Sequence, residues 1–134
     1  MKFLYSALVC LAFFADIIIA DLETYAASVE ACKKLFPVSE DEIKSFYENK
    51  TVQFSNDFKC HTKCILEKEH IFKNGKMDAD SFLKHALQMP SLKNHQAEVL
   101  KTLAECKNIK GSNECDTAFK LGKCLFVDHT TFVH

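Results

Sequence analysis

The sequence contains no arginine and no tryptophan, and only 3 of its 134 residues are glycine and 2 are proline. Without arginine, the chain lacks the planar guanidinium group that dominates recognition of phosphates and nucleic acid bases. The formal net charge is -1 at pH 7, and the lysines form no basic run. These absences argue against nucleic acid as a partner.

Motifs of catalysis and of metal binding are also missing. The chain has no Gly-x-Ser-x-Gly, no Gly-rich phosphate loop, and neither the adjacent Cys-Cys nor the His-Asp run of the secreted calcium-dependent phospholipases. None of the 6 histidines forms a His-x3-His pair or lies at ligand spacing with a second histidine and a carboxylate. We therefore expect a protein that is not an enzyme and that uses neither a metal ion nor a cofactor.

Cysteine, in contrast, is abundant, with 7 residues in the chain. After the first, their order is Cys32-x27-Cys60-x3-Cys64-x41-Cys106-x8-Cys115-x8-Cys124. Six half-cystines in so short a chain form a disulfide framework if the protein passes through an oxidising compartment.

The N-terminal segment indicates such a route. Lys2 precedes a mostly apolar stretch that ends at Ala20, which is the layout of a secretory signal peptide. A membrane anchor is the alternative, but the segment is short and Asp16 would be costly within a bilayer. We expect cleavage after Ala20, loss of Cys10 with the leader, and one secreted domain over 21–134 without stable membrane insertion. Asn49 begins an Asn-Lys-Thr sequon and is a candidate glycosylation site.

Apolar residues recur at helical spacing throughout the mature chain, and no alternating pattern of useful length suggests strands. Ser39 and Glu42 form a capping box at the start of the second helix. The last helix has apolar residues all round, which predicts that it lies at the centre of the fold. The fold class is all-α, with six helices over about 22–36, 40–49, 56–72, 78–89, 91–110 and 114–128, and with a turn at Asn74-Gly75.

Helical geometry restricts the disulfide pairs. Cys60 and Cys64 lie one turn apart on the same face, so each is expected to bond to another element. Cys115 and Cys124 point to opposite sides of the last helix, so this helix is joined to two different neighbours. Geometry alone leaves open which of the fifteen pairings forms.

The six-cysteine order, the signal peptide and the six-helix pattern together resemble the insect odorant-binding (pheromone-binding) protein family, over the whole mature chain. The resemblance implies disulfides Cys32–Cys64, Cys60–Cys115 and Cys106–Cys124. It also implies a compact domain around an apolar internal cavity. The expected function is then a secreted, non-enzymatic carrier of a small hydrophobic ligand, such as an odorant or pheromone, in chemosensory lymph or another secreted fluid. A chemosensory receptor is a candidate partner, and the carrier is expected to be a monomer or weak homodimer.

Two other classes stay open at this point. One is a secreted helical protein that acts through surface contacts with a receptor or another protein, without a ligand cavity. The other is a structural or seminal-type secreted protein with neither a pocket nor an exposed patch.

The mature chain holds nine phenylalanines, and phenylalanines supply half of the candidates for a cavity wall. For each candidate, plain core packing is the competing interpretation. Thr62 is a candidate polar anchor for a head group, with a solvent-facing position as its alternative, and Tyr25 and Tyr47 are comparable. The candidate ligand-binding residues are Phe58, Thr62, Phe72, Met77, Phe82, Ala86, Met89, Val99, Leu103, Phe119, Phe126 and Phe132.

The tail over 129–134 ends on apolar residues, which is unusual for a free terminus. We expect it either to fold over the cavity as a lid or to form a short disordered end. In the first case, protonation of His129 or His134 near pH 5–6 would loosen the lid and weaken ligand binding.

Overall fold

The computed structural model describes residues 25–90 and 92–128, which form six helices and one small hairpin. The predicted signal peptide, Ser91 and the tail over 129–134 lie outside the described residues. None of the described helices is long and apolar enough to cross a membrane. The elements are a helix over 25–35, α2 (Glu40–Tyr47), α3 (Asn56–Lys68), β1 (Phe72–Lys73), β2 (Lys76–Met77), α4 (Ala79–Gln88), α5 (Gln96–Cys106) and α6 (Glu114–Lys123), which continues into the π-helical turn η1 (Cys124–Asp128).

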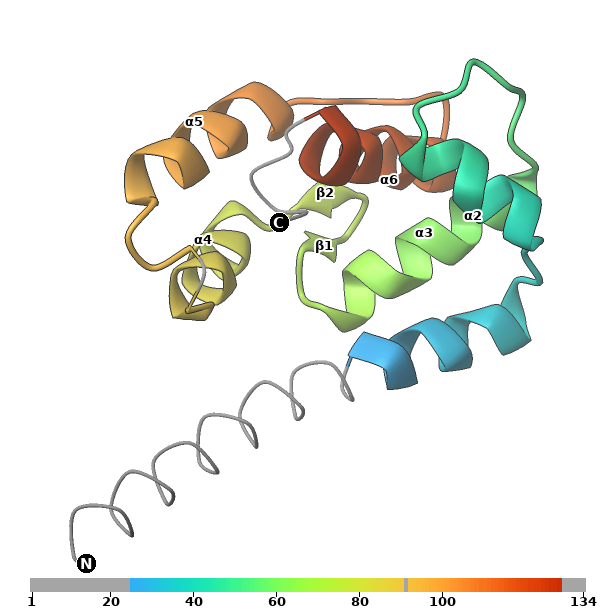
Figure 1. The fold of residues 1–134 in the computed structure, drawn as a ribbon, viewed down its shortest axis with the longest axis horizontal. Coiled ribbons are helices and arrows are strands. Elements are labelled where there is room, and N and C mark those ends of the chain that lie inside the picture. Colours follow the sequence, from blue (N-terminus) through green and yellow to red (C-terminus); the bar gives the residue numbers. More distant parts are fainter. Residues whose placement is uncertain (1–24, 91, 129–134) are drawn as a thin grey trace, which may run out of the picture.

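The all-α prediction is confirmed, and Figure 1 shows how the helices are arranged. The helix over 25–35, α2 and α3 gather at one end of the domain, and α4 and α5 form the other end. Between them lie α6 and the β1–β2 hairpin. The most extensive contact between two helices is that of α3 with α6.

Side-chain caps explain where four of the helices begin. The Ser39 hydroxyl accepts a hydrogen bond from the Glu42 N–H at 3.1 Å, which is the predicted capping box. The sequence offers Asp78 or Asp80 as the start of α4 and Ser112 or Asn113 as the cap of α6, and in the structure Asp78 and Asn113 are the capping residues. The capping residues are Ser39 for α2, Ser55 for α3, Asp78 for α4 and Asn113 for α6.

The third helix was predicted to run to residue 72, which is wrong because the chain leaves the helix earlier. His70 adopts a left-handed conformation with φ 61°. Its N–H donates to the Glu67 carbonyl at 3.1 Å, and the Ile71 N–H donates to the Leu66 carbonyl at 2.8 Å. These two bonds form a Schellman motif, which ends a helix by satisfying its last carbonyls. Sequence reasoning missed this end because glycine, the usual residue at that position, is replaced by histidine.

The residues after this helix end form the hairpin. Phe72 pairs with Met77 and Lys73 with Lys76 in antiparallel register. Asn74 and Gly75 both have positive φ, 55° and 77°, as a two-residue hairpin turn requires. The predicted turn at Asn74-Gly75 is therefore confirmed, whereas the two strands were not predicted.

The fifth helix begins at Gln96, so its predicted start at residue 91 is also wrong. The Met89 carbonyl accepts hydrogen bonds from the N–H groups of Leu92 and Lys93, both at 3.0 Å, and the chain turns here instead of continuing as a helix. Leu92 is buried in the core. Because Leu92 is apolar and buried like the core residues of α5, the sequence pattern included it in the helix and set the predicted start too early.

The disulfides of the structure are Cys32–Cys64, Cys60–Cys115 and Cys106–Cys124. These are the pairs that the family resemblance implies. As geometry required, α6 is joined to two different helices, through Cys115 to α3 and through Cys124 to α5. The three loops span 32, 55 and 18 residues. Loops of these lengths stabilise the folded state by about 3–4 kcal/mol each in the chain-entropy description.

A glycine permits the close approach of α3 and α6. A Cβ atom at Gly122 would lie 2.9 Å from the Thr62 Cγ2 methyl. That methyl has little freedom to move, because the Thr62 hydroxyl donates to the Phe58 carbonyl of the same helix at 3.0 Å. The contact therefore depends on the absence of a side chain at position 122.

We predict that Gly122→Ala destabilises the protein, although Gly→Ala in a helix usually stabilises by about 0.5–1 kcal/mol. Overpacking against Thr62 should cost about 1–3 kcal/mol, measured as the free energy of unfolding in urea. Thr62→Ser removes the methyl and keeps the hydroxyl, so the double variant should regain most of the loss. A Gly122→Ala variant as stable as the unmodified protein would contradict this description of the α3–α6 contact.

Candidate functional site

A continuous apolar cluster lies beside α6, among α4, α5 and the hairpin. Several half-buried apolar side chains pack against its edge: Met77, Leu83, Leu103, Ile109 and Phe126. The buried members are Leu66, Ile71, Phe72, Phe82, Ala86, Leu92, Val99, Cys106, Ala118, Leu121, Cys124 and Leu125. Residues far apart in the sequence thus form one continuous apolar region.

Most of the candidate ligand-binding residues gather in this cluster. Phe72, Phe82, Ala86 and Val99 are buried members, and Met77, Leu103 and Phe126 lie at its edge. They come from the hairpin, α4, α5 and η1. Their proximity agrees with the predicted cavity wall, and their role in binding stays a prediction.

Phe58 and Phe119 belong to a different apolar group, on the side of α6 that faces α2 and α3. They pack with Phe46 and Phe54, with ring centroids 5.0 to 6.2 Å apart. The Lys59 ammonium lies 5.6 Å from the centre of the Phe119 ring. We call these four phenylalanines the aromatic group. These two candidates therefore lie apart from the candidates in the cluster, and their role in binding stays a prediction.

The remaining candidates are dispersed. The hydroxyl of Thr62 donates to the Phe58 carbonyl of its own helix, and its methyl group faces Gly122 of α6. Met89 is 46 % exposed at the end of α4. Phe132 lies outside the described residues.

Sequence reasoning missed Leu121 and Leu125, which are almost completely buried in the cluster. They lie four residues apart, on one face of the helix that α6 and η1 form. The signal was present in the apolar spacing of the last helix, but a helix that reads as apolar all round does not reveal which side faces the cluster. In the structure this helix has an exposed side too, at Lys120.

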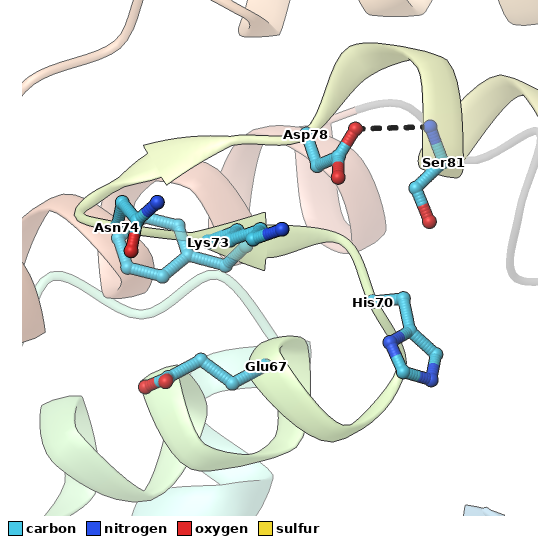
Figure 2. A pocket seen from close by; sticks show the side chains of 7 residues that line it. Glu67, His70, Lys73, Asn74, Asp78 and Ser81 are labelled. Carbon is cyan, nitrogen blue, oxygen red and sulfur yellow. Dashed lines mark hydrogen bonds between the residues drawn. The ribbon is translucent and has the colours of Figure 1, made fainter.

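A polar pocket of about 360 Å³ lies against the outside of the cluster. Figure 2 shows its side chains: Glu67 from α3, Lys73 and Asn74 from the hairpin, and Asp78 and Ser81 at the start of α4, with His70 beside them. Phe72, the remaining lining residue, is also a member of the cluster. Because most of its lining is polar, this pocket differs in character from the apolar cavity that the sequence predicts.

His61 is a buried titratable side chain. It lies on α3 with 5 % of its surface exposed, and its Nδ1 atom has no hydrogen-bond partner within the described part of the chain. Burial, together with the positive charge of Lys33, lowers the pKa of His61 below its usual 6.5. A hydrogen bond to the Cys32 backbone opposes this shift only in part. The neutral form is therefore the one that the fold accommodates.

Asp116 is the buried charge that fixes the start of α6. Its carboxylate accepts a hydrogen bond from the Ser112 N–H at 2.9 Å and pairs with Lys59 and Lys120, each at 3.1 Å. The Ser112 bond and the two ammonium groups hold the pKa of Asp116 well below its usual range, although burial acts in the opposite direction. Asp116 thus links α3, α6 and the turn before α6.

Neither a metal site nor a set of catalytic groups emerges from this geometry. Across residues 25–90 and 92–128, no three histidine, cysteine or carboxylate side chains gather where they could hold a metal ion. The six cysteines in these ranges are all oxidised. What the site offers is a buried apolar cluster with half-buried apolar side chains at its edge.

Comparison with known proteins then decides the family. The profile of the PBP/GOBP family matches residues 16–127, which is most of the chain. The chain belongs to this family of insect odorant-binding proteins. Among its relatives, general odorant-binding protein 19a of Drosophila melanogaster is 28% identical over 109 residues, which cover 78% of this chain and 73% of the relative. General odorant-binding protein 56a of the same species is 31% identical over 92 residues, covering 63% of each.

Solved structures of the family share the fold. Odorant binding protein 4 of Chrysopa pallens has a TM-score of 0.67 and 27% identity, over 78% of this chain and 86% of the other. The fatty acid binding protein OBP56a from the oral disk of the blowfly Phormia regina has a TM-score of 0.60 and 28% identity, over 78% and 88%. Odorant binding protein 5 of Apis mellifera has a TM-score of 0.70 at 17% identity, which supports the fold alone.

Family membership gives a general function. Odorant-binding proteins are secreted carriers of small ligands and not enzymes, and the six-cysteine arrangement of this chain is the one typical of the family.

We predict that acid destabilises the protein in a pH range set by His61. Because its pKa is lower in the folded than in the unfolded state, the unfolded state binds the proton first, and stability falls as the pH drops below about 6.5. The slope should be at most about 1.4 kcal/mol per pH unit for one proton. Asp116 should lose its contribution to the stability only at much lower pH, below the usual pKa range of aspartate.

The measurement is urea unfolding at intervals between pH 7.5 and 5.0. His61→Gln should flatten the curve in this range, whereas His95→Gln, at an exposed position on the N-terminal side of α5, should leave it unchanged. The interpretation fails if both variants keep the same slope as the unmodified protein.

Proposed function

We propose that the mature chain is a secreted carrier that holds one small apolar molecule in a cavity within the cluster beside α6. Membership of the odorant-binding family is the observation that carries this proposal. It is supported by the convergence of Phe72, Phe82, Val99 and Leu103 from separate elements. The half-buried side chains at the edge of the cluster are those that a ligand would cover.

The physical basis of binding would be apolar burial. Removing apolar surface from water is worth about 25 cal/mol per Å². After the cost of immobilising the ligand, dissociation constants in the micromolar range are reasonable for a molecule of ten to twenty heavy atoms. Few polar contacts are needed, since they orient the ligand more than they hold it.

The disulfides would have a second role in such a carrier. An empty apolar cavity costs packing energy, and a small domain without cross-links tends to close it. The disulfides that join α6 to α3 on one side and to α5 on the other would keep the cavity wall in place when no ligand is bound. The protein could then bind and release its ligand without refolding.

The relatives suggest which ligands to test first. The blowfly protein, 28% identical to this chain, is described as a fatty acid binding protein. We propose long-chain carboxylic acids as one ligand class for this chain, alongside neutral volatile odorants and pheromones. Residues 1–20 would be removed on secretion, and a chemosensory receptor stays a candidate partner.

The competing function is that of a secreted helical protein that acts through its surface. Leu35, Val52 and Leu100 are exposed apolar side chains, but they lie on different elements of the fold. Such a protein would show no saturable binding of apolar molecules.

We predict that Leu103→Trp, which fills the cluster from α5, weakens binding of an apolar fluorescent probe by about tenfold or more. Leu100→Trp is the matched control, because Leu100 is 43 % exposed on the same helix. Probe titration and displacement by fatty acids and by neutral odorants measure both variants, with circular dichroism to check folding. Equal affinity of both variants and the unmodified protein would place the ligand elsewhere.

A further inference from the structure

The sequon Asn49-Lys50-Thr51 lies at the C-terminal end of α2, in a conformation that suits its asparagine. Asn49 has φ 56°, in the left-handed region. Its N–H donates to the Phe46 carbonyl at 3.2 Å, and the Lys50 N–H donates to the Ser45 carbonyl at 3.0 Å. This is a second Schellman motif, and asparagine is the residue other than glycine that most readily occupies its left-handed position.

The segment that follows is exposed and held at both ends. Asn49, Lys50 and Thr51 are all exposed, and Figure 1 shows the chain after α2 projecting from the body of the domain. At the far end, the Glu42 carboxylate accepts hydrogen bonds from the N–H of Ser55 at 3.0 Å and from its hydroxyl at 2.8 Å. The acceptor amide therefore lies on a defined protrusion, where a large substituent meets no packed element.

Two apolar side chains flank the sequon without cover. Tyr47, two residues before Asn49, is 51 % exposed, and Val52, three residues after it, is 48 % exposed. Tyr47 packs edge-on against the buried Phe46, with ring centroids 5.3 Å apart, so its ring has a fixed support. The C–H face of a sugar packs well on such a ring, and the sugar hydroxyls can face water.

We propose that Asn49 carries an N-linked glycan whose first sugar lies over Tyr47 and Val52. In the reaction, the Asn49 side-chain nitrogen attacks C1 of the N-acetylglucosamine at the reducing end of a lipid-linked diphosphate oligosaccharide. A C–N bond forms, the C1–O bond to the diphosphate breaks, and the lipid diphosphate leaves. One amide proton passes to a base, and nothing is oxidised or reduced. The proposal rests on the secretory route in the proposed function, but not on ligand binding.

The first test is expression of the full chain, with its own N-terminus, in insect cells, followed by intact-mass analysis of the secreted protein. The unmodified chain and Thr51→Ser should carry one glycan that peptide N-glycosidase removes. Asn49→Gln and Thr51→Ala should be secreted without it, and these two variants control for any other attachment site.

The same four chains are also expressed with an unrelated secretory leader, which separates the glycosylation proposal from the proposed secretory route. If only the chains with the unrelated leader reach the medium, residues 1–20 do not act as a secretory signal peptide, and the mass of the secreted chains still tests glycosylation of Asn49. Secreted protein of unmodified mass in either set overturns the glycosylation proposal.

The position of the glycan is tested by nitration of tyrosine, read out by peptide mass spectrometry. In glycosylated protein, Tyr47 should react several-fold more slowly than in Asn49→Gln, and trimming to a single N-acetylglucosamine should keep the protection. Thr51→Ala, which keeps Asn49 but lacks the glycan, serves as the control, and its Tyr47 should react as fast as that of Asn49→Gln. An equal rate at Tyr47 with and without the glycan would show that the sugar lies away from it.

Discussion

The attachment of α6 on two sides is the constraint on which the rest of the structure depends. Cys60–Cys115 joins it to α3, and Cys106–Cys124 joins it to α5. Asp116 adds a charged link to α3 at the start of the helix, and Gly122 lets the two helices approach closely. In this way α6 connects the two ends of the domain seen in Figure 1.

This placement divides the apolar interior into two parts with different characters. On the α2–α3 side, the aromatic group is a compact set of rings in mutual contact, as expected for a structural core. On the α4–α5 side, the larger cluster has several half-buried members at its edge. The proposed function places the ligand in the larger cluster, because most of the candidate residues gather there.

The sequence predicted the elements whose signals are local. Ser39 and Glu42 sit three residues apart in a capping box, and Asn74-Gly75 is a strong turn signal, so both were identified correctly. The spacing of the cysteines required two partners for the last helix, and the family resemblance supplied the pairs.

Features that depend on tertiary contacts were not predictable in this way. His70 ends α3 in a left-handed conformation, which a histidine does not predict. The strands that follow are only two residues long. Leu92 looked helical because it is buried, although its backbone forms a turn. Phe58 and Phe119 are apolar residues like the other candidates, and only the fold assigns them to the opposite side of α6.

The most direct test of the account is nuclear magnetic resonance of the protein with a bound apolar ligand, read as contacts between ligand protons and assigned side-chain methyl groups. We expect contacts to Val99 and Leu125, whose side chains are buried on the α5 side of α6, and none to the exposed Leu35 or Val52. Contacts confined to exposed methyl groups, or to the neighbourhood of the aromatic group, would contradict the proposed place of binding.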